Sequence, residues 1–446
     1  MKSLFPKLPR EFLTRRHRLV EVLSNISWIV FDSVFRLSLG LYMSVSLARH
    51  LGPVQFGTLS YALVVTTILN PLAKLGLDNI LVRDLIRSSE QTNCILGTAF
   101  GMRLVASFFT AILAYMIAIL LGSSEPGIIP LVAVFSISIL IRPFETISLW
   151  FQSEVQSKYV SYVRSGSLFF AAIVQIILIW QKASLLTFAT LALVEVVLLS
   201  CGLIFVYQKI GSGILNWRFN IGRAKSLLQQ AWPLIFSSLA ITLYMKIDQL
   251  MLGHMLGSES VGIYSAATRI SESSYFFPIA IVSSLTPSLI RTKEKNLFLY
   301  HRRWQQLFSL MVVLGISVAT ILTLGSVSLI QFLFSESYVS AISVLNIHVW
   351  SSTFVFFGLA QGLWDVTENL QKLALVKVTS GSLINIALNI IMIPSYGPVG
   401  AAISTLVSYM FVNYLSNFFH AKTRMIFYFQ SKAFLLACLF PKKSLA

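Results

Sequence analysis

Six basic residues stand inside segments that are otherwise apolar: Arg36, Lys74, Arg103, Arg142, Lys246 and Arg269. A charged side chain inside a membrane costs at least about 2.5–3.5 kcal/mol on insertion scales, so it normally faces a cavity or an opposite charge. In a low-dielectric cavity, arginine binds an anionic phosphate through charge-assisted, bidentate hydrogen bonds. Arg36, Lys74 and Arg269 lie deepest in their segments. We predict that these three line a cavity that binds an anionic substrate.

Acidic residues in the same segments admit two interpretations. Four of them could tune the basic residues or carry coupling protons or sodium ions: Asp32, Asp78, Asp248 and Glu272. Alternatively, acid and base neutralise each other on one helix face, where residues three or four positions apart are neighbours. Such spacing joins Asp32 to Arg36, Lys74 to Asp78, Arg142 to Glu145 and Arg269 to Glu272. For Arg103 and Arg142, near helix ends, structural pairing or snorkelling is the favoured interpretation.

The composition is that of a membrane protein. Hydrophobic residues make up 56% and charged residues only 11% of the 446 residues, and the mean hydropathy is +0.77. A spanning helix needs roughly 20 apolar residues, and the chain offers about twelve such segments. We therefore predict an all-α polytopic membrane protein with spans near 23–49, 57–82, 96–121, 128–150, 160–180, 185–207, 228–253, 261–290, 304–324, 340–364, 373–393 and 399–420. The three cysteines show no metal or redox spacing and no catalytic motif is found, so we predict no metal, no cofactor and no enzyme.

One stretch of the sequence occurs twice. Residues 51–64 read LGPVQFGTLSYALV and residues 256–269 read LGSESVGIYSAATR, with Gly57 aligned on Gly262. The matched glycines and apolar flanks indicate a duplicated half and hence two six-helix bundles. We assign residues 1–210 and 226–424 to the bundles, 211–225 to a polar cytoplasmic linker and 425–446 to an interfacial tail. The second copy ends in Arg269 where the first has Val64, which suggests a transporter whose halves enclose an asymmetric site.

Basic residues are distributed unevenly between the two sides of the predicted membrane domain. One set of alternate connections, the two termini included, holds 26 of the 34 lysines and arginines, and the opposite set holds only Arg49 and Lys182. The positive-inside rule therefore places both termini in the cytoplasm. With this topology the two halves are parallel repeats about an axis along the membrane normal. The net charge of +17 reflects topology and attraction to anionic membrane lipids, so we predict no nucleic-acid partner.

Several stretches resemble one family of transporters. SLARHLGPVQFGTLSYA, GLDNILVRDL and WFQSEVQSKYVSYVRS in the first half, and IDQLMLGHMLGSESVGIYSAATRI and IPSYGPVGAAIST in the second, are similar to Wzx-type oligosaccharide flippases. That family belongs to the MOP superfamily, together with the lipid II flippases and the MATE exporters. The resemblance implies the MATE-like fold, with two six-helix bundles around a central V-shaped cavity. It also implies that Arg269, after the turn of the second half, and Arg36, before the turn of the first, bind substrate.

The resemblance implies a flippase of the bacterial inner membrane. Its substrate would be an undecaprenyl-pyrophosphate-linked oligosaccharide repeat unit, moved to the outer leaflet for O-antigen (lipopolysaccharide) or capsule biosynthesis. The implied partners are this lipid-linked glycan, membrane lipids and the polysaccharide polymerase machinery. Two other classes stay open. One is a MATE-like, ion-coupled small-molecule or drug antiporter with Asp32 as its coupling carboxylate, which the excess of deep basic residues disfavours. The other is a membrane glycan polymerase or ligase, which the short outer connections disfavour.

Overall fold

The computed structural model describes residues 10–121 and 127–439, and every regular element in these ranges is helical. The helices of the first half are α1 (Arg10–Lys74), α2 (Asp78–Arg87), α3 (Thr92–Leu121), α4 (Ile128–Ile141), α5 (Thr146–Ser153), α6 (Ser157–Trp180) and α7 (Leu185–Ile210). The second half begins with α8 (Ile221–Leu256), α9 (Ser258–Ser273), α10 (Phe276–Lys295), α11 (Leu297–Leu324) and α12 (Ser326–Phe334). It continues with α13 (Ala341–His348), α14 (Ser351–Thr367), α15 (Gln371–Met410), a π-helical turn (Phe411–Leu415), α16 (Ser416–Phe419) and α17 (Arg424–Leu439).

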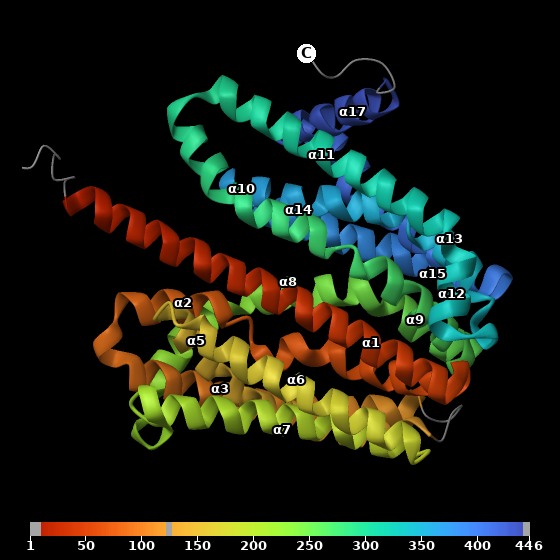
Figure 1. Ribbon diagram of the computed structural model, residues 1–446, viewed down its shortest axis with the longest axis horizontal. Helices are drawn as coiled ribbons and strands as arrows, with labels where there is room; N and C mark the ends of the chain where they lie inside the picture. The colour runs from red at the N-terminus through yellow and green to blue at the C-terminus, as the bar shows by residue number, and fades with distance from the viewer. Residues whose placement is uncertain (1–9, 122–126, 440–446) are drawn as a thin grey trace, which may run out of the picture.

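The helices form two groups that meet at one end (Figure 1). In that view the lower group contains α2, α3, α5, α6 and α7, and the upper group contains α10, α11, α14, α15 and α17. The groups lie close together at the right, where α9, α12 and α13 approach α1, and they stand apart at the left, where α1 begins. The main contacts between the halves join α1 to α9 and to α8. The predicted all-α fold class is confirmed.

The chain is a multi-span membrane protein. Among the described residues, eight helices are long and apolar enough to cross a membrane, or nine if α13 and α14, bent by 41°, count as one span. Two of the eight are far longer than the roughly 20 residues of one crossing: Val34–Arg87 has 54 residues and Gln371–Phe419 has 49. Each contains a glycine with a non-helical backbone, Gly52 in α1 and Gly397 in α15. The count of twelve spans stays a prediction.

The first glycine of each repeat copy has the same backbone conformation. Gly52 has φ 71° and ψ 172°, and Gly257, its aligned partner, has φ 84° and ψ 177°. Positive φ is open to glycine, whereas a side chain would be strained there. Gly52 breaks α1 and Gly257 separates α8 from α9. The repeated glycine is therefore explained by a repeated turn between two helices.

The second glycine of each copy lies at the contact between the halves. A Cβ atom placed on Gly57 would stand 1.7 Å from the backbone oxygen of Ser258, and one on Gly262 would stand 2.0 Å from the backbone oxygen of Pro53. Helices α1 and α9 thus touch backbone to backbone at these two aligned positions. Only residues without a side chain allow this approach. The duplicated pattern is therefore also the seam that joins the two halves.

The segment between the halves is shorter than the predicted linker. Helix α8 begins at Ile221, inside the range 211–225. The preceding residues are held on the start of α3, since Arg218 N donates to Asn93 O at 3.1 Å and Asn220 N donates to Thr98 Oγ1 at 3.1 Å. The side chain of Asn220 then caps α8. Polar composition predicted a linker here because capping residues and loop residues are of the same types.

The last helix docks on the second half through buried polar side chains. Asn417 Nδ2 donates to Gln430 Oε1 of α17 at 3.2 Å and to Gln361 Oε1 of α14 at 2.8 Å. Lys377 Nζ donates to Asn417 Oδ1 at 3.1 Å and lies 3.7 Å from a carboxylate oxygen of Asp365. All five side chains are buried. Helix α17 is therefore held by specific partners as well as by its apolar face.

Candidate functional site

A cavity of about 240 Å³ lies between the two halves, and we call it the central cavity. Its walls are α1 at Ser60–Thr67, α8 at Lys246 and Gln249, and α9 at Ser265–Glu272. Arg269 is the one exposed residue in the otherwise buried stretch 264–270, so its side chain is the part of α9 that faces open space. The cavity follows the glycine seam of α1 and α9 along both helices.

Arg269 has no protein partner. Among the described residues its guanidinium forms neither a hydrogen bond nor an ion pair. Glu272, which the i,i+3 spacing assigned to Arg269, instead pairs with Lys246 of α8 at 3.4 Å. The alternative interpretation, in which Arg269 and Glu272 neutralise each other, is therefore not observed, because a neighbouring helix supplies a competing cation. Arg269 remains available for an anion, as the cavity hypothesis requires.

A second cavity continues from the first along α1. It has a volume of about 320 Å³ and shares Thr67 with the central cavity. Ser238 and Thr242 of α8 line its other side. Half of its lining residues carry hydroxyl or amide side chains, and we call it the middle cavity. It leads on to Lys74 and Asp78, which also belong to a third cavity.

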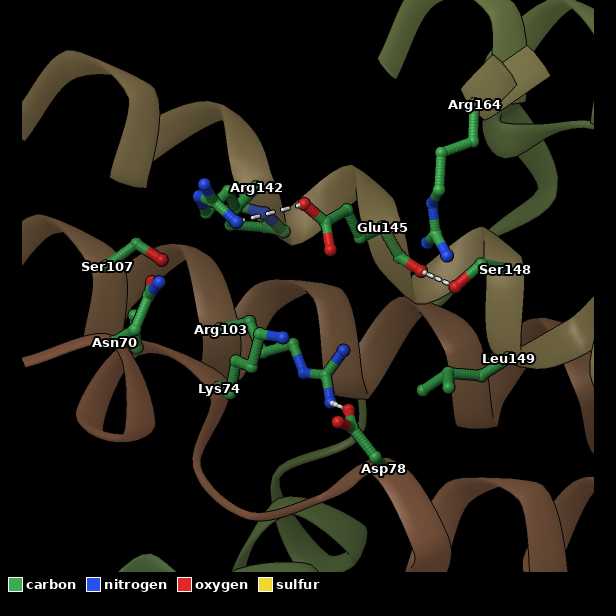
Figure 2. Close-up of a pocket in the computed structure, with 12 residues that line it drawn as sticks. Asn70, Lys74, Asp78, Arg103, Ser107, Arg142, Glu145, Ser148, Leu149 and Arg164 are labelled. Carbon is green, nitrogen blue, oxygen red and sulfur yellow. Dashed lines mark hydrogen bonds and ion pairs between the residues drawn. The ribbon is translucent and has the colours of Figure 1, made fainter. Parts of the chain in front are cut away.

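The third cavity lies inside the first half and carries most of the charge (Figure 2). We define this basic cavity, of about 150 Å³, by its lining charges: Lys74, Asp78, Arg103, Arg142, Glu145 and Arg164. They come from the end of α1, from α2, α3 and α6, and from the short 3₁₀ turn (Arg142–Glu145) between α4 and α5. Four cations thus face two carboxylates.

Two of the four cations are paired with the two carboxylates. Arg103 Nη2 lies 2.5 Å from Asp78 Oδ1, and its Nη1 donates to Thr146 Oγ1 at 3.1 Å. Arg142 Nη1 lies 3.5 Å from Glu145 Oε1. Figure 2 shows both pairs. The predicted structural pairing of Arg142 with Glu145 is thus observed, whereas Asp78 pairs with Arg103 instead of with Lys74.

The other two cations, Lys74 and Arg164, are unpaired. In the ranges that the structure describes, neither side chain forms a hydrogen bond or an ion pair. Lys74 therefore keeps its predicted role as a cavity-lining cation. The sequence analysis did not include Arg164 among the basic residues of the spans, although it lies within the predicted span 160–180. Its position within the first turns of a long apolar helix, α6, was the available signal.

Asp248 lies apart from these cavities in a buried network of α8, α9 and α15. Its carboxylate accepts hydrogen bonds from Asn389 Nδ2 at 2.7 Å, from the Tyr264 hydroxyl at 2.9 Å and from the Thr405 hydroxyl. Asn385 extends the network through Asn389. Within the described residues, no lysine or arginine forms an ion pair with Asp248. This set of oxygen and amide groups fits a proton or a hard monovalent cation.

The predicted site residues therefore fall into separate places. The structure brings Arg269 and Glu272 into the central cavity and Lys74 and Asp78 into the basic cavity. Arg36 is half-buried in α1 before the break at Gly52, and it lines none of the three cavities named above. The side chain of Asp32 lies outside the described residues.

The sequence matches a known family over most of its length. Residues 22–293 match the family described as polysaccharide biosynthesis protein. The chain is 23% identical over 385 residues to the capsular polysaccharide biosynthesis protein CapF of Staphylococcus aureus, covering 83% of this chain and 91% of CapF. It is 29% identical over 181 residues to the probable flippase AglR of Haloferax volcanii, covering 37% of this chain and 35% of AglR. The chain thus spans less than half the length of some curated relatives that it matches.

Two solved structures show the same fold. An inward-facing multidrug resistance MATE family transporter of the MOP superfamily aligns with a TM-score of 0.70 at 15% identity, covering 90% of this chain and 96% of that one. The lipid II flippase MurJ in an inward closed conformation aligns with a TM-score of 0.69 at 14% identity, covering 93% of each chain. The chain thus has the same fold as these two transporters. With more than half of its residues matched, the chain belongs to the polysaccharide biosynthesis protein family.

Proposed function

We propose that the chain is a flippase for lipid-linked oligosaccharides. It moves an undecaprenyl-pyrophosphate-linked repeat unit from the cytoplasmic to the outer leaflet of the bacterial inner membrane, where a polymerase uses it for O-antigen or capsule. The observation that carries the proposal is Arg269, a cation that has no partner among the described residues and lies in a cavity between two halves of a membrane protein. The names of CapF and AglR support this class. Transport of this kind needs no covalent step, so the chain is a transporter and not an enzyme.

Two of the three cavities match the two polar parts of such a substrate. A pyrophosphate cannot enter hydrocarbon unaided, and Arg269 offers it a planar pair of donors. Lys246, held by Glu272, adds a second cation beside it. The polar middle cavity gives the glycan hydroxyls their hydrogen bonds. The polyprenyl tail stays in the lipid, so the protein transfers only the polar head.

Asp248 is proposed as the coupling group. Helix α9 carries Arg269, which faces the central cavity, and Tyr264, whose hydroxyl donates to Asp248. A proton or sodium ion arriving at Asp248 therefore changes a hydrogen bond of the helix that holds the substrate anion. Lys246 lies two residues before Asp248 on α8 and pairs with Glu272 of α9. The coupling site and the substrate site thus share the same two helices.

The charge of the central cavity disfavours a cationic drug as substrate. Two cations, Lys246 and Arg269, face one carboxylate, Glu272. An antiporter for organic cations needs the opposite excess, because a desolvated like charge is repelled. The MATE-like fold itself does not decide between the two substrates, since one fold hosts many functions.

The proposed direction of transport rests on the distribution of basic residues, with both termini in the cytoplasm. A reporter fused after Gly211 is expected to be cytoplasmic, and one fused after Gly257 is expected to be external. The long helix α8 (Ile221–Leu256) lies between these two positions. An external reading at Gly211 would reverse the proposed topology.

The test of the function is the substitution of Arg269. Arg269→Ala is expected to lower surface display of the glycan at least about tenfold, since a charge-assisted hydrogen bond contributes about 1.5–3 kcal/mol. Arg269→Lys is expected to retain only part of the glycan display, because the point charge of an ammonium group does not reproduce the planar guanidinium with its paired donors. Arg302→Ala is the matched control, being an exposed arginine of α11 outside the three cavities. Surface display of the glycan is measured together with the abundance of the protein. Normal glycan display by an Arg269→Ala variant of normal abundance would refute the proposed role of Arg269 in substrate binding.

A further inference from the structure

The basic cavity holds more positive charge than its own carboxylates neutralise. Asp78 and Glu145 are engaged by Arg103 and Arg142, which leaves Lys74 and Arg164 unpaired around a space of about 150 Å³. Unpaired charge within a membrane protein is expensive unless it meets an anion or water in a cavity. The cavity therefore has the chemistry of an anion site, and it is walled entirely by the first half.

This site is too far from Arg269 to serve the same phosphate group. Val64 of α1 lines the central cavity together with Arg269, and Lys74 of α1 lines the basic cavity. Ten residues of helix separate them, which corresponds to about 15 Å at 1.5 Å per residue. A pyrophosphate, two phosphorus atoms joined by one oxygen, is much shorter than that. The two sites are therefore about three helical turns apart along α1.

The space between the two anion sites is suited to neutral sugars. The middle cavity joins them, sharing Thr67 with the central cavity and Asn70 with the basic cavity. Ser238 and Thr242 add hydroxyl groups to its wall. The basic cavity is smaller than the roughly 300–1,000 Å³ of ordinary ligand pockets, so it admits a small charged unit and not a whole glycan.

We propose that the basic cavity binds an acidic group of the glycan, a carboxylate or phosphate substituent, while Arg269 binds the pyrophosphate. The substrate is then an acidic oligosaccharide on its lipid carrier. This inference rests on the proposed function and adds the class of glycan. Arg103 and Arg142 are fixed by their carboxylates and shape the wall, and Lys74 and Arg164 supply the net charge that the acidic group neutralises.

The test compares two substrates that differ only in charge. Purified protein in lipid vesicles is given a polyprenyl-pyrophosphate oligosaccharide that contains a uronic acid. A second sample receives the same compound with the uronic acid carboxylate converted to its methyl ester, which removes that one charge. Arg164→Gln is expected to slow transport of the acid about tenfold, equivalent to about 1.4 kcal/mol, and that of the ester less than about twofold. Lys158→Gln is the matched control, because Lys158 is exposed on the same helix and lies over the Tyr159 ring outside the cavity.

The outcomes separate this inference from the proposed function. Equal slowing of both substrates by Arg164→Gln would mean that the pyrophosphate itself passes the basic cavity, and would overturn the inference. Unchanged transport of both would overturn it as well, leaving Arg164 a structural residue. Arg269→Ala is expected to stop both substrates. Transport of both by that variant would refute the function, whatever Arg164 does. The melting temperature of each variant in detergent verifies that the protein is folded.

Discussion

Gly57→Ala is expected to weaken the seam between the two halves. Its Cβ would stand 1.7 Å from the backbone oxygen of Ser258, where an ordinary contact begins at 3.4 Å, so the two backbones must separate by about 1.7 Å. No side chain can rotate away, because the obstacle is main chain. Overpacking of this kind costs about 1–3 kcal/mol, and such an energy shifts an equilibrium between two conformations about 5–150-fold. The closed seam thus becomes less populated.

The assay is labelling of a cysteine placed in the central cavity. Ser60→Cys, in a chain without its natural cysteines, is exposed to a membrane-impermeant maleimide from the side on which Gly52 and Gly257 lie. Gly57→Ala is expected to raise the labelling rate, since the seam stands between that side and Ser60. Gly40→Ala is the control, because a Cβ on this glycine of α1 meets nothing within 4 Å. Equal labelling of both variants at equal abundance would refute the seam as a gate.

Three further predictions concern buried charge and the repeat. Lys377→Ala is expected to lower the free energy of unfolding by about 3–5 kcal/mol, because it leaves the buried carboxylate of Asp365 without its cation. Thermal unfolding in detergent measures this loss, and the double variant Lys377→Ala/Asp365→Ala is expected to recover part of the lost stability. Asp248→Asn is expected to abolish the response of vesicle transport to an imposed proton or sodium gradient, and a retained response would place coupling elsewhere. Val64→Arg is expected to restore part of the glycan display lost in Arg269→Val, because positions 64 and 269 line one cavity; no rescue at normal abundance would contradict this.

The sequence predicted most of what depends on composition and repetition. Apolar runs showed the fold class, since lipid imposes helices on every spanning segment. The aligned pair Gly52 and Gly257 showed the repeated turn, because only glycine adopts that backbone without strain. The aligned pair Gly57 and Gly262 was visible too, although its role was not. A close approach of two helices requires small residues, which are visible in the sequence. The sequence does not show which helix is the partner.

Local spacing failed where the true partner came from another helix. The i,i+3 rule joined Arg269 to Glu272, but Lys246, on α8, competes successfully for that carboxylate. The i,i+4 rule joined Lys74 to Asp78, but Arg103, on α3, lies 2.5 Å from it. Arg269 and Glu272 share one helix, where such a pair gains only about 0.2–0.5 kcal/mol, so a well-placed cation from a neighbouring helix overrides it. Lys74 and Asp78 do not share a helix, because the chain turns at Leu75 and Gly76 between α1 and α2, and the i,i+4 spacing therefore does not apply.

The network of Asp248 was invisible for the same reason. Asn385 and Asn389 are polar residues four positions apart in an apolar helix, which predicts a common polar face but not what it meets. Tyr264 reaches Asp248 from α9 and Thr405 from the second part of α15. Three segments therefore converge on one carboxylate of α8. Such convergence follows from the packing of the halves and has no local signature.

The central cavity lies where the two repeat copies face each other. This position explains why only one of the two aligned positions, 64 and 269, carries an arginine. Ser60 and Ser265 are aligned positions and both line it, as do Val64 and Arg269. Two arginines at the aligned positions would repel each other in the empty cavity. With one arginine, the proposed binding site of the substrate anion lies on the second half, which also carries Asp248. The first half contributes the basic cavity instead. Under the proposed function, separation of the halves at their glycine seam would move the pyrophosphate with the half that contains Asp248, and the glycan would be released by the other half.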